Sequence, residues 1–213
     1  MKFDGVIFDL DGTLLDTLRD LCDSTNHALA SFGFPRRSLE EIRSFVGNGI
    51  GNLVARSLPE NTDAKTFEKV LSVFKEHYAK NSRNKTAPYP GIAELLEDLK
   101  REGVKTAVVS NKADFAVQTL VDDFFPGLVT VAIGELSGVA RKPDPATTLL
   151  AMEKMGTCNV VYVGDSEVDV ETAKNANISG IFVDWGFRSE KQLRESGAET
   201  VVHSAKELYE RLV

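Results

Sequence analysis

Six short runs of apolar, mostly β-branched residues recur along this chain, and they constrain its fold more than any other feature. The runs are VIF (6–8), VKTAVV (104–109), LVTVAI (128–133), NVVYVG (159–164), GIFVDW (180–185) and ETVVHS (199–204). Most are continuously apolar, as is typical of parallel strands that are covered on both faces. Helical patterns separate them, and these include GIAELLEDLKREG (91–103), PATTLLAMEKMG (145–156) and a final helix with a possible capping box of Ser204 and Glu207. This alternation predicts an α/β fold with a doubly wound, Rossmann-like parallel sheet.

Residues 16–85 interrupt the alternation, because this segment contains no convincing strand pattern. It reads as four helical stretches, which are TLRDLCDSTNHALASFG, SLEEIRSFV, GNLVARSL and AKTFEKVLSVFKEHYAK. The stretch NKTAPYPG (84–91) then returns the chain to the strand–helix rhythm, and its two prolines are typical of a linker. We therefore predict an α/β core made of residues 1–15 and 86–213, with a helical cap at 16–85 inserted after the first strand.

Composition excludes several classes of protein. The net charge of −7 and the pI of about 5.1 argue against a nucleic-acid-binding surface, which is normally basic. No apolar run approaches the roughly 20 residues that a membrane helix needs, and the N-terminus lacks the pattern of a signal peptide. The two cysteines lie far apart and have no metal-binding spacing, so neither a zinc site nor a disulfide is indicated. We expect a cytoplasmic protein without a membrane or nucleic-acid partner.

Two carboxylates follow the first apolar run in the stretch GVIFDLDGT (5–13). Burying Asp9 and Asp11 without partners would be costly, which raises the question of what they do. If the chain stays extended, both side chains point to the same side, about 6–7 Å apart. Gly12 allows an unusual backbone angle or a close approach by another group. Taken alone, this stretch is better explained as a polar strand end followed by a turn.

Polar residues at three further places change this balance. Ser110-Asn111 ends one predicted strand, Gly164-Asp165 ends another and is followed by Asp169, and Lys142 precedes a predicted helix. Each has an ordinary structural explanation, such as a helix cap or a surface cation. Because the carboxyl ends of parallel strands meet at one edge of a sheet, the groups together predict a single site.

The charges at this site indicate a divalent metal ion. Several carboxylates at close range resist joint ionisation, and a divalent cation relieves that repulsion. The candidate ligands are few and all are oxygens, which suits Mg²⁺ held together with a substrate phosphate. Lys142 adds a compact positive charge for phosphoryl oxygens.

In four ordered motifs the chain resembles the phosphohydrolases of the haloacid dehalogenase superfamily. The motifs are Asp9-Leu10-Asp11-Gly12-Thr13, Ser110-Asn111, Lys142-Pro143, and Gly164-Asp165 with Asp169. The resemblance covers nearly the whole chain, including a helical cap between the first and second motifs. It implies the fold, the metal and the type of reaction.

The resemblance also implies roles for the residues. Asp9 is the nucleophile that forms an aspartyl-phosphate, and Asp11 is the general acid and then the general base. Ser110 and Lys142 bind the phosphoryl group. The second acid, Asp11, favours phosphate ester hydrolysis, because true dehalogenases lack it and a departing halide needs no proton.

The remaining implied contacts concern the metal and the substrate. Mg²⁺ is held by Asp9, the main-chain carbonyl of Asp11 and Asp165. Asp169 supports the metal directly or through an intermediate group, and Thr13 and Asn111 contact the substrate.

Within the superfamily, the stretches FVGNGIGNLVARSL (45–58), SNK (110–112) and PYPGI (88–92) resemble phosphoglycolate phosphatases. This implies 2-phosphoglycolate as the substrate, with Asn48 in a cap loop over the site and Arg43 or Arg56 on the substrate carboxylate. A plain helix–helix turn with surface arginines explains the same segment equally well.

Other functions stay open at this point. Within the superfamily they are a phosphatase of another small metabolite such as a sugar phosphate, a pyrophosphatase, and a β-phosphoglucomutase-like enzyme, although the cap lacks a loop rich in Arg and Lys. From a different class, a phospho-accepting receiver module also gathers acids, a hydroxyl and a lysine at strand ends. Its acceptor would normally lie on a later strand, and the helical insertion would have no role there. The sequence leaves monomer and homodimer both open.

Overall fold

The computed structural model describes residues 2–213, which divide into two compact units. One unit comprises the chain up to Leu15 together with Pro88–Val213, and the other is Asp16–Ala87. The boundary predicted from the sequence lies two residues earlier, between residues 85 and 86. Within residues 2–213, no helix is both long enough and apolar enough to cross a membrane.

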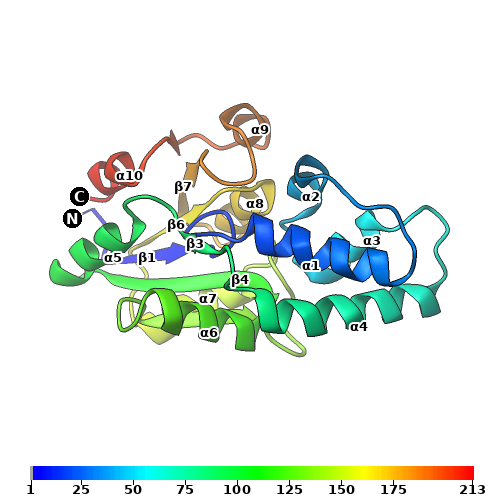
Figure 1. Cartoon of the computed structure of the whole chain (residues 1–213). Coiled ribbons are helices and arrows are strands. Elements are labelled where there is room, and N and C mark those ends of the chain that lie inside the picture. The colour runs from blue at the N-terminus through cyan, green and yellow to red at the C-terminus, as the bar shows by residue number, and fades with distance from the viewer. Residues whose placement is uncertain (1) are drawn as a thin grey trace. The chain divides into compact units, whose positions relative to one another are not determined.

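Six strands of the described chain form one parallel sheet in the first unit, in the order β5-β4-β1-β6-β7-β8 (Figure 1). They are β1 (Gly5–Phe8), β4 (Lys105–Ala113), β5 (Val131–Glu135), β6 (Val160–Gly164), β7 (Ser179–Val183) and β8 (Val201–Val202). Each overlaps one of the six predicted runs, so the predicted α/β fold is confirmed. The chain adds β4 and β5 on one side of β1 and the other three strands on the opposite side. This reversal creates a topological switch point, where α/β sheets bind ligands.

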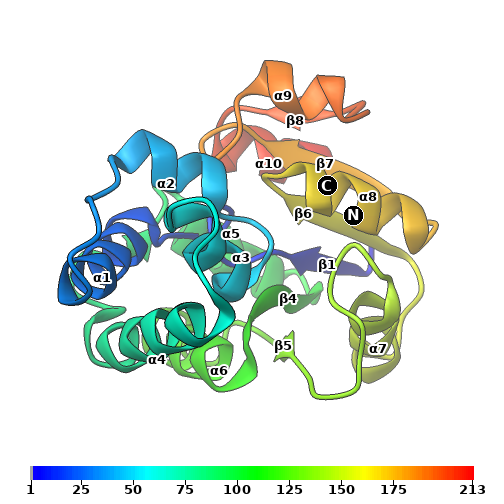
Figure 2. The ribbon, with the colours of Figure 1, turned by 90° about the vertical axis from the view of Figure 1, so that its right-hand side faces the viewer.

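Helices cover both faces of this sheet. α5 (Ile92–Arg101), α6 (Asp114–Phe124) and α10 (Ala205–Leu212) pack on the face that carries Val6 and Phe8. α7 (Ala146–Met155), α8 (Glu167–Asn175) and α9 (Glu190–Glu195) pack on the face that carries Ile7 and Tyr162. Figure 2 shows α7 and α8 on the same side of β1. Double coverage explains why the strand sequences are continuously apolar.

Two helix ends predicted from the sequence can be compared with the structure, and one of them needs a correction. α7 ends at Met155 and is capped by Gly156, which has a left-handed backbone with φ of 66°. At the start of α10, Ser204 Oγ accepts a hydrogen bond from the N–H of Glu207 at 3.2 Å. The Glu207 carboxylate, however, accepts from the N–H of His203 at 2.9 Å instead of from that of Ser204. The predicted capping box is therefore wrong in its second half.

The second unit contains α1 (Leu18–Ser31), α2 (Leu39–Phe45), α3 (Gly49–Ser57) and α4 (Ala64–Asn81), which match the four predicted helical stretches. α1 and α4 pack side by side, and His27 of α1 stacks on His77 of α4 with ring centroids 4.1 Å apart. The buried carboxylate of Asp20 on α1 accepts hydrogen bonds from the N–H groups of Lys85 and Thr86. These bonds fasten the end of the unit to its first helix.

Two very short strands lie where the chain passes between the units. β2 (Leu15–Asp16) and β3 (Ala87–Pro88) pair with each other. Neither strand was predicted from the sequence, because two residues are too few to give a periodic signal.

Strand β4 has an irregular register at its carboxyl end. Val109 pairs with Ile133 and Ala113 pairs with Glu135, so β4 uses four steps where β5 uses two. The bulge therefore holds residues 110–112. Gly134 of β5 permits it, because a Cβ there would lie 2.6 Å from the carbonyl oxygen of Lys112 and 2.4 Å from the Cα of Asp114. Bulges of this kind commonly re-aim side chains next to a functional site.

Candidate active site

The strand register brings the predicted polar residues to one edge of the sheet. Phe8 at the end of β1 pairs with Val108 of β4 and with Val163 of β6. Asp9 follows immediately, and its N–H donates to the carbonyl of Val163 at 2.9 Å. Asp9 therefore follows the end of β1, the bulge lies at the end of β4, and Asp165 follows the end of β6. These three parallel strands are neighbours in the sheet.

Lys142 lies at the centre of a buried network. Its Nζ is 3.0 Å from Asp9 Oδ1, 2.8 Å from Asp169 Oδ1 and 3.0 Å from the hydroxyl of Tyr162. Only 2% of the Lys142 side chain is exposed. Burial by itself lowers the pKa of this lysine, but Asp169 and Asp9 hold the pKa well above its usual value. The ammonium group therefore stays charged.

Two of the acids have unusual proton affinities. Burial raises the pKa of Asp9 to about 7, and this value includes an opposing effect of Lys142 and a further rise from Asp169 and Asp11. Burial, followed by the charges of Asp169 and Asp9, raises the pKa of Asp165 well above its usual range. Burial away from water is thus the main cause of both raised pKa values, and the crowding of like charges adds to it.

The same crowding fits a divalent cation. Oxygens of Asp9, Asp165 and Asp169 all lie within 4.8 Å of one another. Asp9, Asp11, Asp165 and Asp169 would carry −4 when ionised, and Lys112 and Lys142 carry +2, which leaves −2. One divalent ion has the charge that balances this difference, and carboxylate oxygens are the ligands that Mg²⁺ prefers.

Asp169, like Asp11 and Asp165, has protein donors at both of its oxygens, but it has more of them. Oδ1 faces Lys142 and accepts from the Tyr162 hydroxyl at 3.2 Å. Oδ2 accepts from Ser166 Oγ at 2.6 Å and from the N–H groups of Asp165 and Ser166. Ser166 and Asp169 also form the capping box of α8. This geometry favours indirect support of a metal through Lys142 and the 165–166 backbone.

Asp165 is held from two sides. Thr13 Oγ1 donates to Asp165 Oδ1 at 3.1 Å, and the N–H of Phe187 donates to Oδ2 at 2.7 Å. Gly12 has a φ of 87°, and a Cβ on it would lie 2.3 Å from Asp165 Oδ2, so it has both properties expected of this glycine. Thr13 is fully buried and its hydroxyl supports Asp165, and its predicted contact with substrate stays a prediction.

The bulge of β4 supplies two further contacts. Lys112 Nζ lies 2.9 Å and 3.0 Å from the two carboxylate oxygens of Asp11. Asn111 Nδ2 donates to the main-chain carbonyl of Lys142 at 3.1 Å, so the amide predicted to contact substrate anchors the lysine loop. Ser110, also buried, accepts from the N–H of Lys112 at 3.4 Å.

Three residues of the site were missed from the sequence. They are Lys112, Tyr162 and Phe187, and the last acts through its main-chain N–H. Lysine and tyrosine within apolar strand sequence are the signal that could have identified the first two, because such groups are rarely buried without partners. The contact of Phe187 leaves no mark on the sequence.

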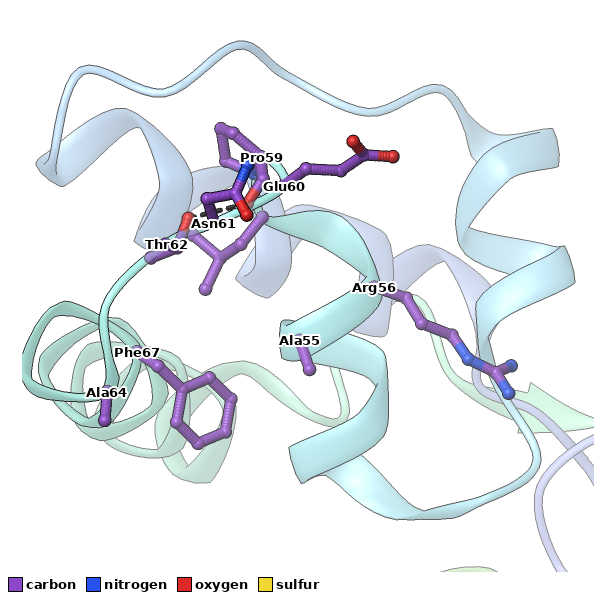
Figure 3. A pocket seen from close by; sticks show the side chains of 9 residues that line it. Ala55, Arg56, Pro59, Glu60, Asn61, Thr62, Ala64 and Phe67 are labelled. Atoms are coloured by element: carbon purple, nitrogen blue, oxygen red, sulfur yellow. Dashed lines mark hydrogen bonds between the residues drawn. The ribbon is translucent and has the colours of Figure 1, made fainter.

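The predicted cap residues belong to the second unit. Arg43 is exposed near the end of α2, and Asn48 precedes α3 between two glycines with left-handed backbones, Gly47 and Gly49. Arg56 lines a pocket formed by the end of α3, the following loop and the start of α4, and its side chain points away from Phe67 (Figure 3). The Arg56 guanidinium lies 3.5 Å from the carbonyl of Phe45. Substrate contacts by these residues stay a prediction.

Comparison with known proteins agrees with this geometry. Residues 6–183 match the model of the haloacid dehalogenase-like hydrolase family. The chain belongs to this family. It is 35% identical to phosphoglycolate phosphatase 1 of Pseudomonas aeruginosa, over 95% of this chain and 77% of that protein. It is 32% identical to a phosphoglycolate phosphatase of Mesorhizobium japonicum, over 98% of this chain and 96% of that protein.

A solved structure is similarly close. A protein of Lactobacillus delbrueckii subsp. bulgaricus, whose assignment as a phosphoglycolate phosphatase is itself a proposal, superposes with a TM-score of 0.94. The two chains are 39% identical, and the match covers 100% of this chain and 99% of that one. The family and these relatives confirm the predicted class of enzyme, a phosphatase.

Asp169→Asn should destabilise the core of this family member by about 3–5 kcal/mol, because it leaves the buried Lys142 short of a counter-charge. It also turns an amide N–H₂ toward groups that donate to the present carboxylate. Urea unfolding followed by the fluorescence of Trp185, the single tryptophan of the chain, measures the change. Glu171→Gln, which removes an exposed carboxylate from the same helix, is the matched control and should change stability by less than about 0.5 kcal/mol. Equal stability of the two variants would contradict a central role for Asp169.

Proposed function

We propose that this protein is a Mg²⁺-dependent phosphatase that hydrolyses 2-phosphoglycolate to glycolate and phosphate through an aspartyl-phosphate on Asp9. The observation that carries the proposal is the pairing of two neighbouring acids with two different lysines. Asp9 contacts Lys142 and Asp11 contacts Lys112, so the two carboxylates have distinct surroundings. Such a difference in environment is how one site assigns nucleophile and acid–base roles to two carboxylates.

In the first step, a carboxylate oxygen of Asp9 attacks the phosphorus atom. The bond from phosphorus to the ester oxygen breaks, and its electron pair goes to that oxygen. Asp11, present as the carboxylic acid, gives it a proton, so that glycolate leaves as the alcohol. Lys142 and Ser110 stabilise the negative charge on the phosphoryl oxygens.

In the second step, water attacks the phosphorus of the aspartyl-phosphate. Asp11, now a carboxylate, takes a proton from that water. The bond from phosphorus to Asp9 breaks, and its electron pair restores the Asp9 carboxylate as phosphate leaves. Asp11 is again protonated, which readies the site for another ester.

The carboxylates of Asp9 and Asp165 and the main-chain carbonyl of Asp11 would hold Mg²⁺. When bound, the ion supplies positive charge that offsets the carboxylates and the phosphoryl oxygens. Asp169 keeps Lys142 and the 165–166 backbone in place, and Thr13 and the N–H of Phe187 orient Asp165.

The choice of substrate rests on the relatives, several of which are named phosphoglycolate phosphatases. 2-Phosphoglycolate carries a carboxylate, and we assign its recognition to the second unit. Arg43 is the proposed partner of that carboxylate, and Asn48 is the proposed polar contact of the glycine-flanked loop.

Asp9→Asn should lower kcat for 2-phosphoglycolate by at least about 10³-fold, because an amide cannot act as the nucleophile. Release of inorganic phosphate in the presence of Mg²⁺ measures this. Asp4→Asn removes an exposed carboxylate at the other end of β1 and should leave the rate unchanged. Retained activity in Asp9→Asn would contradict the proposal. A long-lived phosphorylated Asp9 without repeated turnover would favour the receiver module instead.

Mg²⁺ should raise the unfolding midpoint of the wild type but not that of Asp165→Asn. A ligand that binds only the folded state stabilises it, by about 2.7 kcal/mol at a hundred times its Kd. The shift is read from thermal unfolding with and without EDTA, so the result does not depend on catalysis. Asp4→Asn is again the control and should respond as the wild type does. An equal shift in Asp165→Asn would place the ion elsewhere.

2-Phosphoglycolate should be hydrolysed with a kcat/KM about 10- to 100-fold above that of ethyl phosphate. The two esters differ by the carboxylate, and a hydrogen bond to a charged group contributes about 1.5–3 kcal/mol. A panel of small phosphate esters and pyrophosphate, assayed at one Mg²⁺ concentration, provides the comparison. A sugar phosphate or pyrophosphate with a higher kcat/KM would replace the proposed substrate while leaving the proposed reaction type intact.

A further inference from the structure

We propose that Lys112 is a positioning residue that holds the Asp11 carboxylate in the orientation in which it exchanges a proton with the ester or the attacking water. This inference rests on the proposed function, and it concerns a residue that directly follows Ser110-Asn111 and to which no role was assigned from the sequence. Lys112 touches the proposed acid–base group, so its effect on the reaction passes through Asp11.

The contact itself restricts rotation of the carboxylate. Nζ faces both oxygens of Asp11 at nearly equal distances, 2.9 Å and 3.0 Å. The lysine side chain is 3% exposed, whereas that of Asp11 is 20% exposed. The ammonium group therefore holds Asp11 from the protein side, with little screening by solvent, and leaves it accessible from the other side.

The position of Lys112 is fixed by its backbone. Lys112 lies in the bulge of β4, which approaches β5 closely. A Cβ on Gly134 of β5 would lie 2.6 Å from the carbonyl oxygen of Lys112. The N–H of Gly134 also donates to the side chain of Asp114 at 2.7 Å. The backbone around Lys112 is thus held against the neighbouring strand.

Stability alone is a poor reason for this pair. A buried ion pair is often no more stable than well-packed apolar side chains of similar volume, because both charges lose their hydration. Lys142 cannot take over the role of Lys112, because its three N–H donors face Asp9, Asp169 and Tyr162. The contact with Asp11 is therefore made by a second lysine, Lys112.

The experiment compares Lys112→Met with the wild type on three esters. Ethyl phosphate and 2-phosphoglycolate have poor leaving groups that need a proton from Asp11, whereas p-nitrophenolate leaves without one. The quantity measured is kcat/KM, which reports the steps up to formation of the phosphoenzyme. We expect a loss of roughly 10- to 100-fold on both alkyl esters and less than about threefold on p-nitrophenyl phosphate.

The outcomes separate this role from its alternatives. Equal losses on all three esters would mean a structural role. A loss confined to 2-phosphoglycolate would mean that Lys112 binds the substrate carboxylate, and no loss would mean no role. Each of these results overturns the inference. If the wild type hydrolyses none of the esters, the proposed function fails first, which is a distinct result.

Two further variants complete the test. In Asp11→Asn, adding Lys112→Met should cause little further loss on ethyl phosphate, because a positioning residue acts through Asp11. Lys105→Met removes a lysine from the exposed start of the same strand and should keep all three rates. If Lys112→Met does not fold, as judged by its unfolding curve, Lys112→Gln is measured by the same criteria. Independent losses that multiply in the double variant would also overturn the inference.

Discussion

The buried ammonium group of Lys142 is the interaction on which the rest of the site depends. It joins the nucleophile candidate Asp9 at the end of the central strand to Asp169 in the first turn of α8, with the Tyr162 hydroxyl as its third neighbour. Such a charge is tolerated in the interior only while its partners remain in place. The ammonium group thereby fixes the end of β1, its own loop and the start of α8 relative to one another. Asp165 is positioned by the same helix start, because its N–H donates to the Asp169 carboxylate.

The order of strands in the sheet brings these side chains together without any special path of the chain. β1 lies between β4 and β6, so residues that are about 100 and 155 positions away from it in the chain follow neighbouring strand ends. Lys142 belongs to no strand, and its loop is anchored by the side-chain amide of Asn111. The bulge of β4 thus does two things, since it anchors the loop of one lysine and supplies the other lysine itself.

The sequence predicted the parts of this protein whose signals are local. All six strands of the sheet, the four helices of the insertion and the convergence of Asp9, Asp11, Lys142 and Asp165 follow from apolar runs and from polar residues at their ends. Other features depend on neighbours that are distant in the chain. The contact of Lys112 with Asp11 requires a bulge that Gly134 on another strand permits, and the hydroxyl of Thr13 turns to Asp165 because Asp165 is buried beside it. Glu207 has the spacing of a capping box, but the N–H of His203 competes for its carboxylate.

The pairing of two neighbouring acids with two separate lysines suits the proposed chemistry. A nucleophile must stay fixed on the phosphorus, whereas the acid–base group must reach first a leaving oxygen and then a water molecule. A single cation shared by Asp9 and Asp11 would couple these tasks, because movement toward one carboxylate would weaken its hold on the other. Lys142 is committed to Asp9 and Asp169, and Lys112 faces both oxygens of Asp11. Every one of these contacts lies within the α/β unit, so the pairing of the two acids with their two lysines depends on no residue of the helical unit.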